Sequence, residues 1–386
     1  MPTEKNAPVY LAACTDYDDA RLTEILREAF SSIGITGSEI SGKRVVIKPN
    51  LVMASSPDKA ATTHPAFVRA AAAVLTELGA ASVTLAESPG GPWNAASMSL
   101  IYRTCKMTEA VSDSLKLNDD YTWQNVHVDG VKLKNFHCIT AIAEADVVVD
   151  LCKLKSHTLT GYSGAVKNLF GVIPGVEKFE MHSTFPALED FSAMLVDLCS
   201  WLTDNKTFIA VCDAITGMEG NGPTHGTPVS LGTVLVSRSP FALDCIGAHM
   251  IRRDGEIAHV TSAADRGLMP ADWREIPILG LNEVPTYDFR RPDSDAGSIL
   301  NNLSNVWGGR LVKLFEARPS INTKRCVGCG KCVANCPRQA MELVGSGKRK
   351  HAAIHRDACI RCYCCQELCP VGAVDTKQNP LIRLIH

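Results

Sequence analysis

Nine of the sixteen cysteines fall between Cys326 and Cys369. Eight of them form two runs with the spacing C-x2-C-x2-C-x3-C, each followed by proline: Cys326, Cys329, Cys332 and Cys336, then Cys359, Cys362, Cys365 and Cys369. In such runs the first three thiolates bind one 4Fe–4S cluster and the fourth binds the other. We therefore expect two clusters, the first held by Cys326, Cys329, Cys332 and Cys369, and the second by Cys336, Cys359, Cys362 and Cys365.

Two other interpretations of these thiols are structural cysteines and a pair of zinc sites. Zinc sites pair C-x2-4-C units at a distance and do not add a third cysteine after two more residues. Cys364 is the ninth cysteine, and the spacing favours its neighbour Cys365 as the ligand. The repeat continues beyond the ligands, since CPRQAMEL matches CPVGAVDT, which predicts a short strand after each fourth cysteine.

Four stretches of the preceding body combine polar residues with apolar runs: residues 45–52 (VVIKPNLV), 152–178, 213–228 and 239–249. With His182, four residues after Lys178, they supply the candidate site residues: Lys48, Asn50, Lys153, Lys155, His157, Lys167, Asn168, Lys178, His182, Glu219 and Asp244. Lysines beside glycine-exposed N–H groups suit an anion such as a phosphate, a carboxylate or an enolate-like intermediate. We therefore expect these residues to bind an anionic small molecule.

Among these candidates, Lys167, His157 and His182 are the expected catalytic residues, the histidines as proton donors. The acids suit a metal or proton transfer. The competing interpretation is that each lysine is solvated at the surface and each histidine is structural. Cys152 lies beside these lysines, which could lower the pKa of its thiol.

The elements that must position these residues alternate between strands and helices. Apolar runs predict strands at residues 9–13, 44–47, 82–86, 146–151, 207–212 and 233–236, and helical spacing predicts helices at 18–32, 64–78, 240–250 and 257–266. This order predicts an α/β body with a mostly parallel sheet and helices on both faces, plus a small α+β ferredoxin-like C-terminal domain. Open α/β sheets bind ligands at the carboxyl ends of their strands.

The domain boundaries follow from composition. We expect the body at residues 1–284, a linker and helix at 285–320, the cluster domain at 321–376 and an extension at 377–386. From residue 321 onward there are 11 basic and 4 acidic residues, whereas the whole chain has 39 and 41, which leaves 28 and 37 to the rest. A basic tail therefore follows an acidic body.

Charge and composition also limit the partners. The basic tail either balances cluster charge or docks an acidic redox protein such as a ferredoxin or flavodoxin. It has one aromatic residue that could stack a base, Tyr363, so we expect no nucleic acid partner. No apolar stretch approaches the ~18 residues of a membrane span. Acidic residues stand where a signal peptide needs an apolar core, so we expect a cytoplasmic location.

Two families share these motifs. The body resembles the uncharacterised family domain of unknown function 362 in five sequence segments: IKPN, DVVVDLCKLKSH, SGAVKNLFGVIPG, DAITGMEGNGP and FALD. The tail resembles the bacterial two-cluster ferredoxins, which implies two 4Fe–4S clusters and one-electron transfer. The first family often carries such a module on the same chain, and it has no agreed activity. The resemblance supports the architecture and the location of the site and names no substrate.

Together these features favour an iron–sulfur oxidoreductase that passes low-potential electrons to an anionic substrate or cofactor bound by the body. Whether the body binds a further cofactor stays open. The alternative is a non-catalytic electron donor, or an assembly and maturation factor for another redox protein or cofactor.

Overall fold

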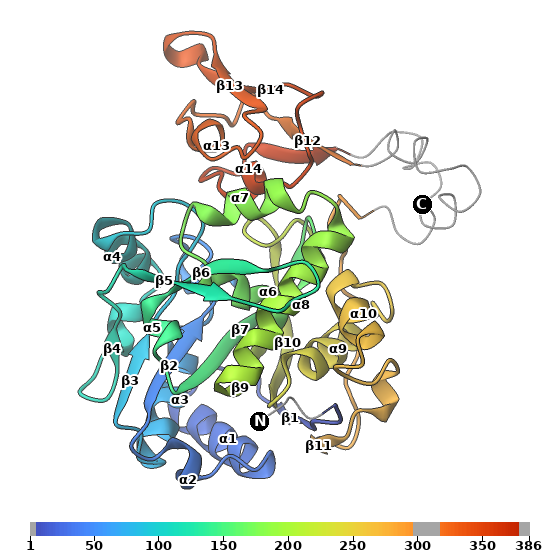
Figure 1. The fold of residues 1–386 in the computed structure, drawn as a ribbon. Helices are drawn as coiled ribbons and strands as arrows, with labels where there is room; N and C mark the ends of the chain where they lie inside the picture. The colour runs from blue at the N-terminus through green and yellow to red at the C-terminus, as the bar shows by residue number, and fades with distance from the viewer. Residues whose placement is uncertain (1–4, 296–316, 378–386) are drawn as a thin grey trace.

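The computed structural model describes residues 5–295 and 317–377 (Figure 1). The helix expected within 285–320 and the extension beyond Lys377 lie outside the described residues. The body is built on one nine-stranded sheet in the order β11-β1-β10-β9-β7-β2-β3-β4, with β8 paired to β7. The strands are β1 (Val9–Ala13), β2 (Arg44–Pro49), β3 (Ser82–Leu85), β4 (Lys116–Leu117), β7 (Val147–His157), β8 (Gly161–Ser163), β9 (Thr207–Glu219), β10 (Thr227–Ser237) and β11 (Ile278–Gly280).

The sheet is mostly parallel. Only β10, between β1 and β9, and β8 run antiparallel to their neighbours. The other pairs are parallel, so β2, β3, β7 and β9 all end at the same edge. Side chains of β7 alternate between two apolar cores, with Val147 and Val149 on one side and Val148 and Cys152 on the other.

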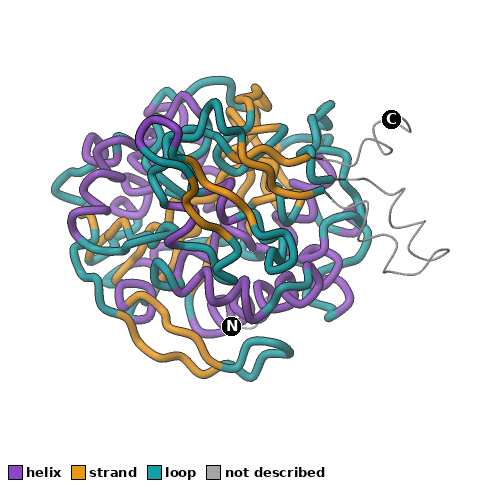
Figure 2. Tube along the Cα trace, turned by 90° about the horizontal axis from the view of Figure 1, so that it is seen from above, coloured by secondary structure: helices purple, strands orange, loops and turns teal. Residues whose placement is uncertain are grey.

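Helices cover both faces of the sheet, as expected; Figure 2 shows the arrangement from above. One face packs against α1 (Asp19–Ser32), α3 (Pro65–Glu77) and α4 (Ala95–Thr104). The other packs against α6 (Ala165–Asn168), α8 (Leu188–Asn205), α9 (Pro240–Met250) and α10 (Ala258–Asp265). The local sequence determines where two of these helices begin. The side chains of Asp18 and Ser239 accept hydrogen bonds from backbone N–H groups in the first turns of α1 and α9.

The shorter elements complete the body. The hairpin of β5 (Trp123–His127) and β6 (Asn135–Ile139) lies outside the main sheet. The short helices are α2 (Gly37–Ile40), α5 (Thr140–Ala143), α7 (Glu177–Thr184) and the 3-10 turns Pro57–Lys59, Met107–Ala110, Leu169–Val172 and Trp273–Glu275. The α/β fold class is confirmed.

Two strand ends were predicted wrongly. The strand expected to end at residue 151 continues to His157, and the one expected to end at 212 continues to Glu219. Lys153 and Asp213 are register partners on β7 and β9, and their side chains form an ion pair at 2.8 Å. Because each charge neutralises the other, polar residues continue strands that the apolar pattern would end.

The tail is a small α+β unit with internal symmetry, and it lies beside α7 above the body (Figure 1). β12 (Arg318–Ile321) pairs with β15 (Val374–Lys377), and β13 (Met341–Val344) pairs with β14 (His351–Ile354), all antiparallel. A 3-10 turn (Gly347–Arg349) joins the last two. The third cysteine of each run lies in a short helix, α13 (Lys331–Ala334) or α14 (Cys364–Glu367), and a strand follows each fourth cysteine, as predicted.

Candidate functional site

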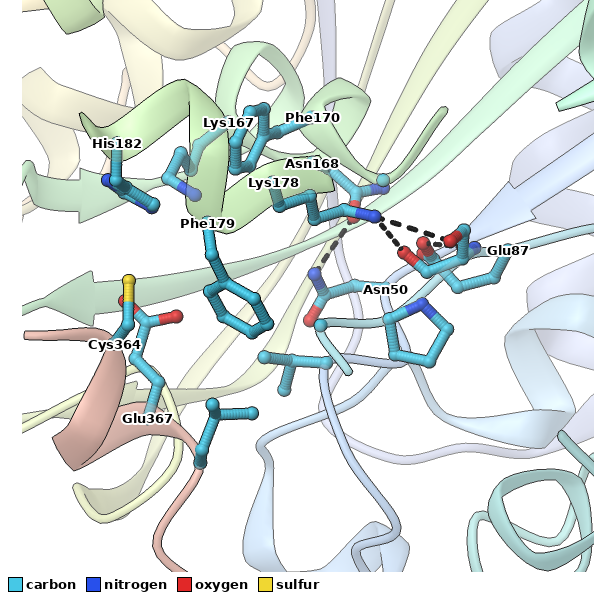
Figure 3. Close-up of a pocket in the computed structure, with 16 residues that line it drawn as sticks. Asn50, Glu87, Lys167, Asn168, Phe170, Lys178, Phe179, His182, Cys364 and Glu367 are labelled. Atoms are coloured by element: carbon cyan, nitrogen blue, oxygen red, sulfur yellow. Dashed lines mark hydrogen bonds between the residues drawn. The ribbon is translucent and has the colours of Figure 1, made fainter. Parts of the chain in front are cut away.

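A cavity of about 80 Å³ lies where the carboxyl ends of β2 and β3 meet α6, α7 and the tail helix α14 (Figure 3). Segments that are far apart in sequence form its wall. The lining residues are Asn50, Val52, Glu87, Ser88, Pro89, Gly90, Lys167, Asn168, Phe170, Gly171, Lys178, Phe179, His182, Cys364, Glu367 and Leu368. The last three belong to the tail, so body and tail build this cavity together.

A buried ion pair anchors the floor of the cavity. Lys48 Nζ donates to Glu87 Oε2 at 2.6 Å and to Asn168 Oδ1 at 3.2 Å. Asn168 Nδ2 in turn donates to Asp150 Oδ1 at 2.7 Å. Burial raises the pKa of Asp150 well above its usual range, against the opposing effect of Lys48. A Cβ at Gly171 would lie 2.1 Å from Glu87 Oε1, so only glycine fits against this pair.

Asn50 links this floor to a second lysine. Its amide nitrogen donates to Asn168 Oδ1 at 2.8 Å, and its oxygen accepts from Lys155 Nζ at 2.6 Å. Lys155 also donates to the carbonyl of Ala61 at 2.7 Å. Burial lowers the pKa of Lys155 to about 7. Lys155 is therefore held behind the wall and orients Asn50.

Lys178 on α7 closes the side of the cavity formed by the loop after β3. Its Nζ donates to the carbonyl of Ser88 at 2.6 Å and to the carbonyl of Ile173. Burial lowers the pKa of Lys178 to about 7. Since its hydrogen bonds are already made within the protein, Lys178 fixes this loop.

Lys167 on α6 differs from the other lysines. Within residues 5–295 and 317–377, no group accepts a hydrogen bond from its Nζ or forms an ion pair with it. The Nζ lies 4.6 Å from the ring centroid of Phe170. Burial lowers its pKa, and the charge of Glu367 acts in the opposite direction. Lys167 is thus the cavity lysine whose ammonium group is available to a ligand.

The two candidate histidines are neutral. His182 lines the cavity, stacked 4.4 Å from Phe191, and burial followed by the charge of Lys167 lowers its pKa to about 3. Burial also holds the pKa of His157 well below its usual range. His157 Nδ1 accepts the backbone N–H of Leu159 at 3.1 Å, so the ring proton lies on Nε2, 3.3 Å from Glu367 Oε1. His157 contacts the tail and does not line the cavity.

Three candidate residues lie elsewhere. Lys153 is paired with Asp213 on the opposite face of the sheet, beside Tyr17. Glu219 accepts the backbone N–H of Arg290 at 2.9 Å. Asp244 accepts the first backbone N–H groups of α6 at 2.6 and 2.9 Å. Asp244 therefore positions the helix that carries Lys167, and Lys153 and Glu219 have structural partners away from the cavity.

The neighbouring lysines do not lower the pKa of the Cys152 thiol. Its thiol is buried against Cys212 on the neighbouring strand, and burial raises the pKa of Cys152 well above the usual value. Its neighbour Lys153 points to the other face of the sheet. Cys152 is a small core residue.

Several cavity residues were missed at the sequence level. Glu87 lies two residues after the end of β3, so the rule that drew attention to Lys48 at the end of β2 could have found it. Phe179 lies beside Lys178 on the motif helix α7. No local signal indicated Glu367 or Leu368, because their role depends on how the tail meets the body.

The eight predicted cluster ligands line two further cavities in the tail. Cys326, Cys329, Cys332 and Cys369 share one, and Cys336, Cys359, Cys362 and Cys365 share the other. Backbone N–H groups point at the sulfurs: Ala340 N lies 3.2 Å from Cys336 Sγ and Ala373 N 3.1 Å from Cys369 Sγ. In the described part of the chain no three metal-binding side chains could hold a single ion. Four thiols around each cavity fit a cluster, so the chemistry of the donor set agrees with the predicted assignment.

The loop between β9 and β10 holds the tail against the body. Gln366 Nε2 donates to the carbonyl of Asn221 at 3.0 Å, and Thr224 Oγ1 donates to the carbonyl of Glu367 at 3.2 Å. His225 Nε2 lies 2.7 Å from the carbonyl of Cys369. These contacts fall on the segment between the last two cysteines, which carries predicted ligands of both clusters and also lines the body cavity.

Residues 45–249 match the family described as domain of unknown function (DUF362). That span is more than half of the 386 residues. The chain belongs to this family. Residues 325–373 match the 4Fe–4S dicluster domain, which supports the binding of 4Fe–4S clusters by the tail of this DUF362 protein. Both resemblances seen in the sequence are confirmed.

Of two relatives of the DUF362 chain, one matches most of its length and the other matches only its tail. A thylakoid-associated protein of Synechocystis sp. is 29% identical over 292 residues, which cover 74% of this chain and 88% of the relative. An uncharacterized ferredoxin of Methanocaldococcus jannaschii is 37% identical over 60 residues, 15% of this chain and 92% of the relative.

One solved structure similar to the chain is the lactate racemase apoprotein from Thermoanaerobacterium thermosaccharolyticum. The TM-score is 0.39 at 13% identity, and the match covers 66% of this chain and 59% of that one. Within residues 5–295 and 317–377, no helix is long and apolar enough to cross a membrane.

Proposed function

We propose that the chain is an iron–sulfur oxidoreductase that passes low-potential electrons from two 4Fe–4S clusters to a small anionic ligand in the cavity between body and tail. One observation carries the proposal. The cavity wall joins Lys167, which has no hydrogen bond or ion pair to any described residue, to Cys364 and Glu367, which flank the predicted cluster ligand Cys365. An anion bound at Lys167 would therefore lie beside the tail segment that holds a cluster.

The residues of this site have separate roles in the proposal. Lys167 binds the anion, since its ammonium group is buried and forms no ion pair with a described residue. The buried network of Lys48, Glu87 and Asn168 fixes the floor, and Asp244 fixes the start of α6. The bound clusters would supply electrons one at a time.

The proton donor in this proposal is Lys167. Both histidines are neutral, and His157 faces Glu367 and not the cavity. The Lys167 ammonium group has a lowered pKa, which makes it a better proton donor than an exposed lysine. We therefore assign proton donation to Lys167 in place of His157 and His182.

A suitable surface for a redox partner lies at the cavity lined by Cys326, Cys329, Cys332 and Cys369. Val327 and Val371 line that cavity and are 62% and 41% exposed. Lys324, Lys331 and Lys350 are exposed nearby and have no acidic partner in the described ranges. An apolar centre with a positive rim suits an acidic ferredoxin or flavodoxin.

The test is anaerobic reduction of the full-length protein, addition of small anions and measurement of reoxidation by visible absorbance. We expect one class of anion to accelerate reoxidation, Lys167→Met to slow it at least tenfold, and Lys167→Arg to retain most of it. If no anion accelerates reoxidation while a stoichiometric protein partner copurifies, the alternative of an electron-donating or maturation factor replaces the proposal.

A further inference from the structure

Besides the His182 ring, two polar groups of the cavity wall lack hydrogen-bond partners among the described residues. One is Lys167 Nζ, from the body. The other is Glu367 Oε1, from the tail, which is buried and accepts no hydrogen bond. His157 Nε2 lies 3.3 Å from this oxygen but outside hydrogen-bonding geometry. A buried carboxyl oxygen without a donor is costly, so a ligand that supplies one would be favoured.

The side chains of Lys167 and Glu367 both line the cavity. Figure 3 shows Lys167 and Glu367 directed toward one another from opposite sides, with Phe179 beside them. They form no ion pair, so Lys167 Nζ and the Glu367 oxygens lie more than 4.0 Å apart. Three other polar side chains of the wall are already occupied, because Asn50 and Asn168 bond to each other and Lys178 bonds to the loop after β3.

Size and polarity limit what fits. A cavity of about 80 Å³ is well above the ~10–15 Å³ that a single water needs, so it admits a small molecule. Apolar side chains line the remaining wall: Val52, Pro89, Phe170, Phe179 and Leu368. One available cation suits one negative charge. A second charge on the ligand would lie near Glu367 and be repelled.

We propose that the cavity binds a small monocarboxylate that carries an O–H or N–H group. The carboxylate pairs with Lys167, the O–H or N–H donates to the carboxylate of Glu367, and the carbon skeleton contacts Phe179. This inference names the ligand class of the proposed function, and it concerns the same cavity. Because Glu367 belongs to the tail, the ligand would also bridge the two parts of the chain.

The experiment is isothermal titration calorimetry on the oxidised, cluster-loaded full-length protein, with glycolate, acetate and oxalate as probes. Glycolate has the carboxylate and the hydroxyl, acetate has only the carboxylate, and oxalate has two charges. We expect glycolate to bind about tenfold more tightly than acetate, the contribution of one hydrogen bond to a charged acceptor. Oxalate should bind more weakly than acetate.

Variants separate the two contacts. Lys167→Met should weaken glycolate and acetate alike by at least tenfold, whereas Lys43→Met, on an exposed lysine of the body, should change neither. Glu367→Gln keeps an oxygen acceptor and removes the charge, so we expect it to retain the glycolate preference and relieve the oxalate penalty. Glu367→Ala should reduce the glycolate preference to within about twofold. General damage to the tail would not produce this pattern.

Equal affinity for glycolate and acetate, a preference that survives Glu367→Ala, or no binding by any probe would overturn the inference. Because the protein is oxidised, electron transfer plays no part in the measurement. Glycolate binding without any reoxidation of reduced protein would leave this inference intact and remove the proposed function. Reoxidation by an anion of another class, without glycolate binding, would leave the proposed function intact and remove this inference.

Discussion

Replacing Lys48 by methionine should destabilise the body strongly. The Lys48 side chain is 0% exposed and that of Glu87 4% exposed, with 2.6 Å between Nζ and Oε2. The substitution would leave the Glu87 carboxylate buried without its cation, and Asn168 Oδ1 would lose a donor. Breaking one side of a buried pair costs about 3–5 kcal/mol. That is a large part of a typical unfolding free energy of about 5–15 kcal/mol.

The assay is urea unfolding under anaerobic conditions, followed by tryptophan fluorescence. Residues 317–377 contain no tryptophan, so the signal reports on the rest of the chain. We expect the double variant Lys48→Met/Glu87→Gln to recover at least about 2 kcal/mol, because no unpaired charge remains. The exposed control Lys43→Met should stay within about 0.5 kcal/mol of the parent. A cost below about 1 kcal/mol for Lys48→Met, or strict additivity in the double variant, would refute the reasoning.

Three further predictions concern the tail, the cavity and their contact. Cys336→Ser should remove the cluster held with Cys359, Cys362 and Cys365 and largely spare the other, as low-temperature EPR and iron content would show; loss of only the other cluster would contradict the assignment. Lys178 has a pKa of about 7 in the folded state and about 10.4 when unfolded. The unfolded state thus binds more protons between these values, and stability should rise with pH from about 7 to 10 in the parent relative to Lys178→Met; parallel pH profiles would argue against this. His225→Ala should speed amide exchange in residues 364–372, whereas His355→Ala, on an exposed surface pair, should not; unchanged exchange would show that His225 does not hold the tail.

Much of the fold could be predicted from sequence, since apolar runs and helical spacing are local signals. The boundaries of α9 (Pro240–Met250) agree with the prediction, because Ser239 caps the helix and Pro240 suits its first turn. The ends of β7 and β9 could not be predicted in the same way. They depend on the pairing of Lys153 with Asp213, two residues 60 positions apart.

The candidate site was predicted in part for the same reason. Lys48, Asn50 and Lys167 come from separate segments, and the rule that ligands bind at the carboxyl ends of parallel strands indicates that they meet. That rule does not show which lysines already have internal partners. Glu367 could not be predicted at all, because it enters the cavity through contacts such as that of Gln366 with Asn221.

The central claim is that a ligand bound at Lys167 lies beside one particular cluster. Low-temperature EPR of the reduced protein, recorded with and without a saturating small carboxylate, tests it directly. We predict that the ligand shifts only the signal of the cluster assigned to Cys336, Cys359, Cys362 and Cys365, and that the shift is absent in Lys167→Met. A shift confined to the other cluster, or none at ligand saturation, would contradict the account.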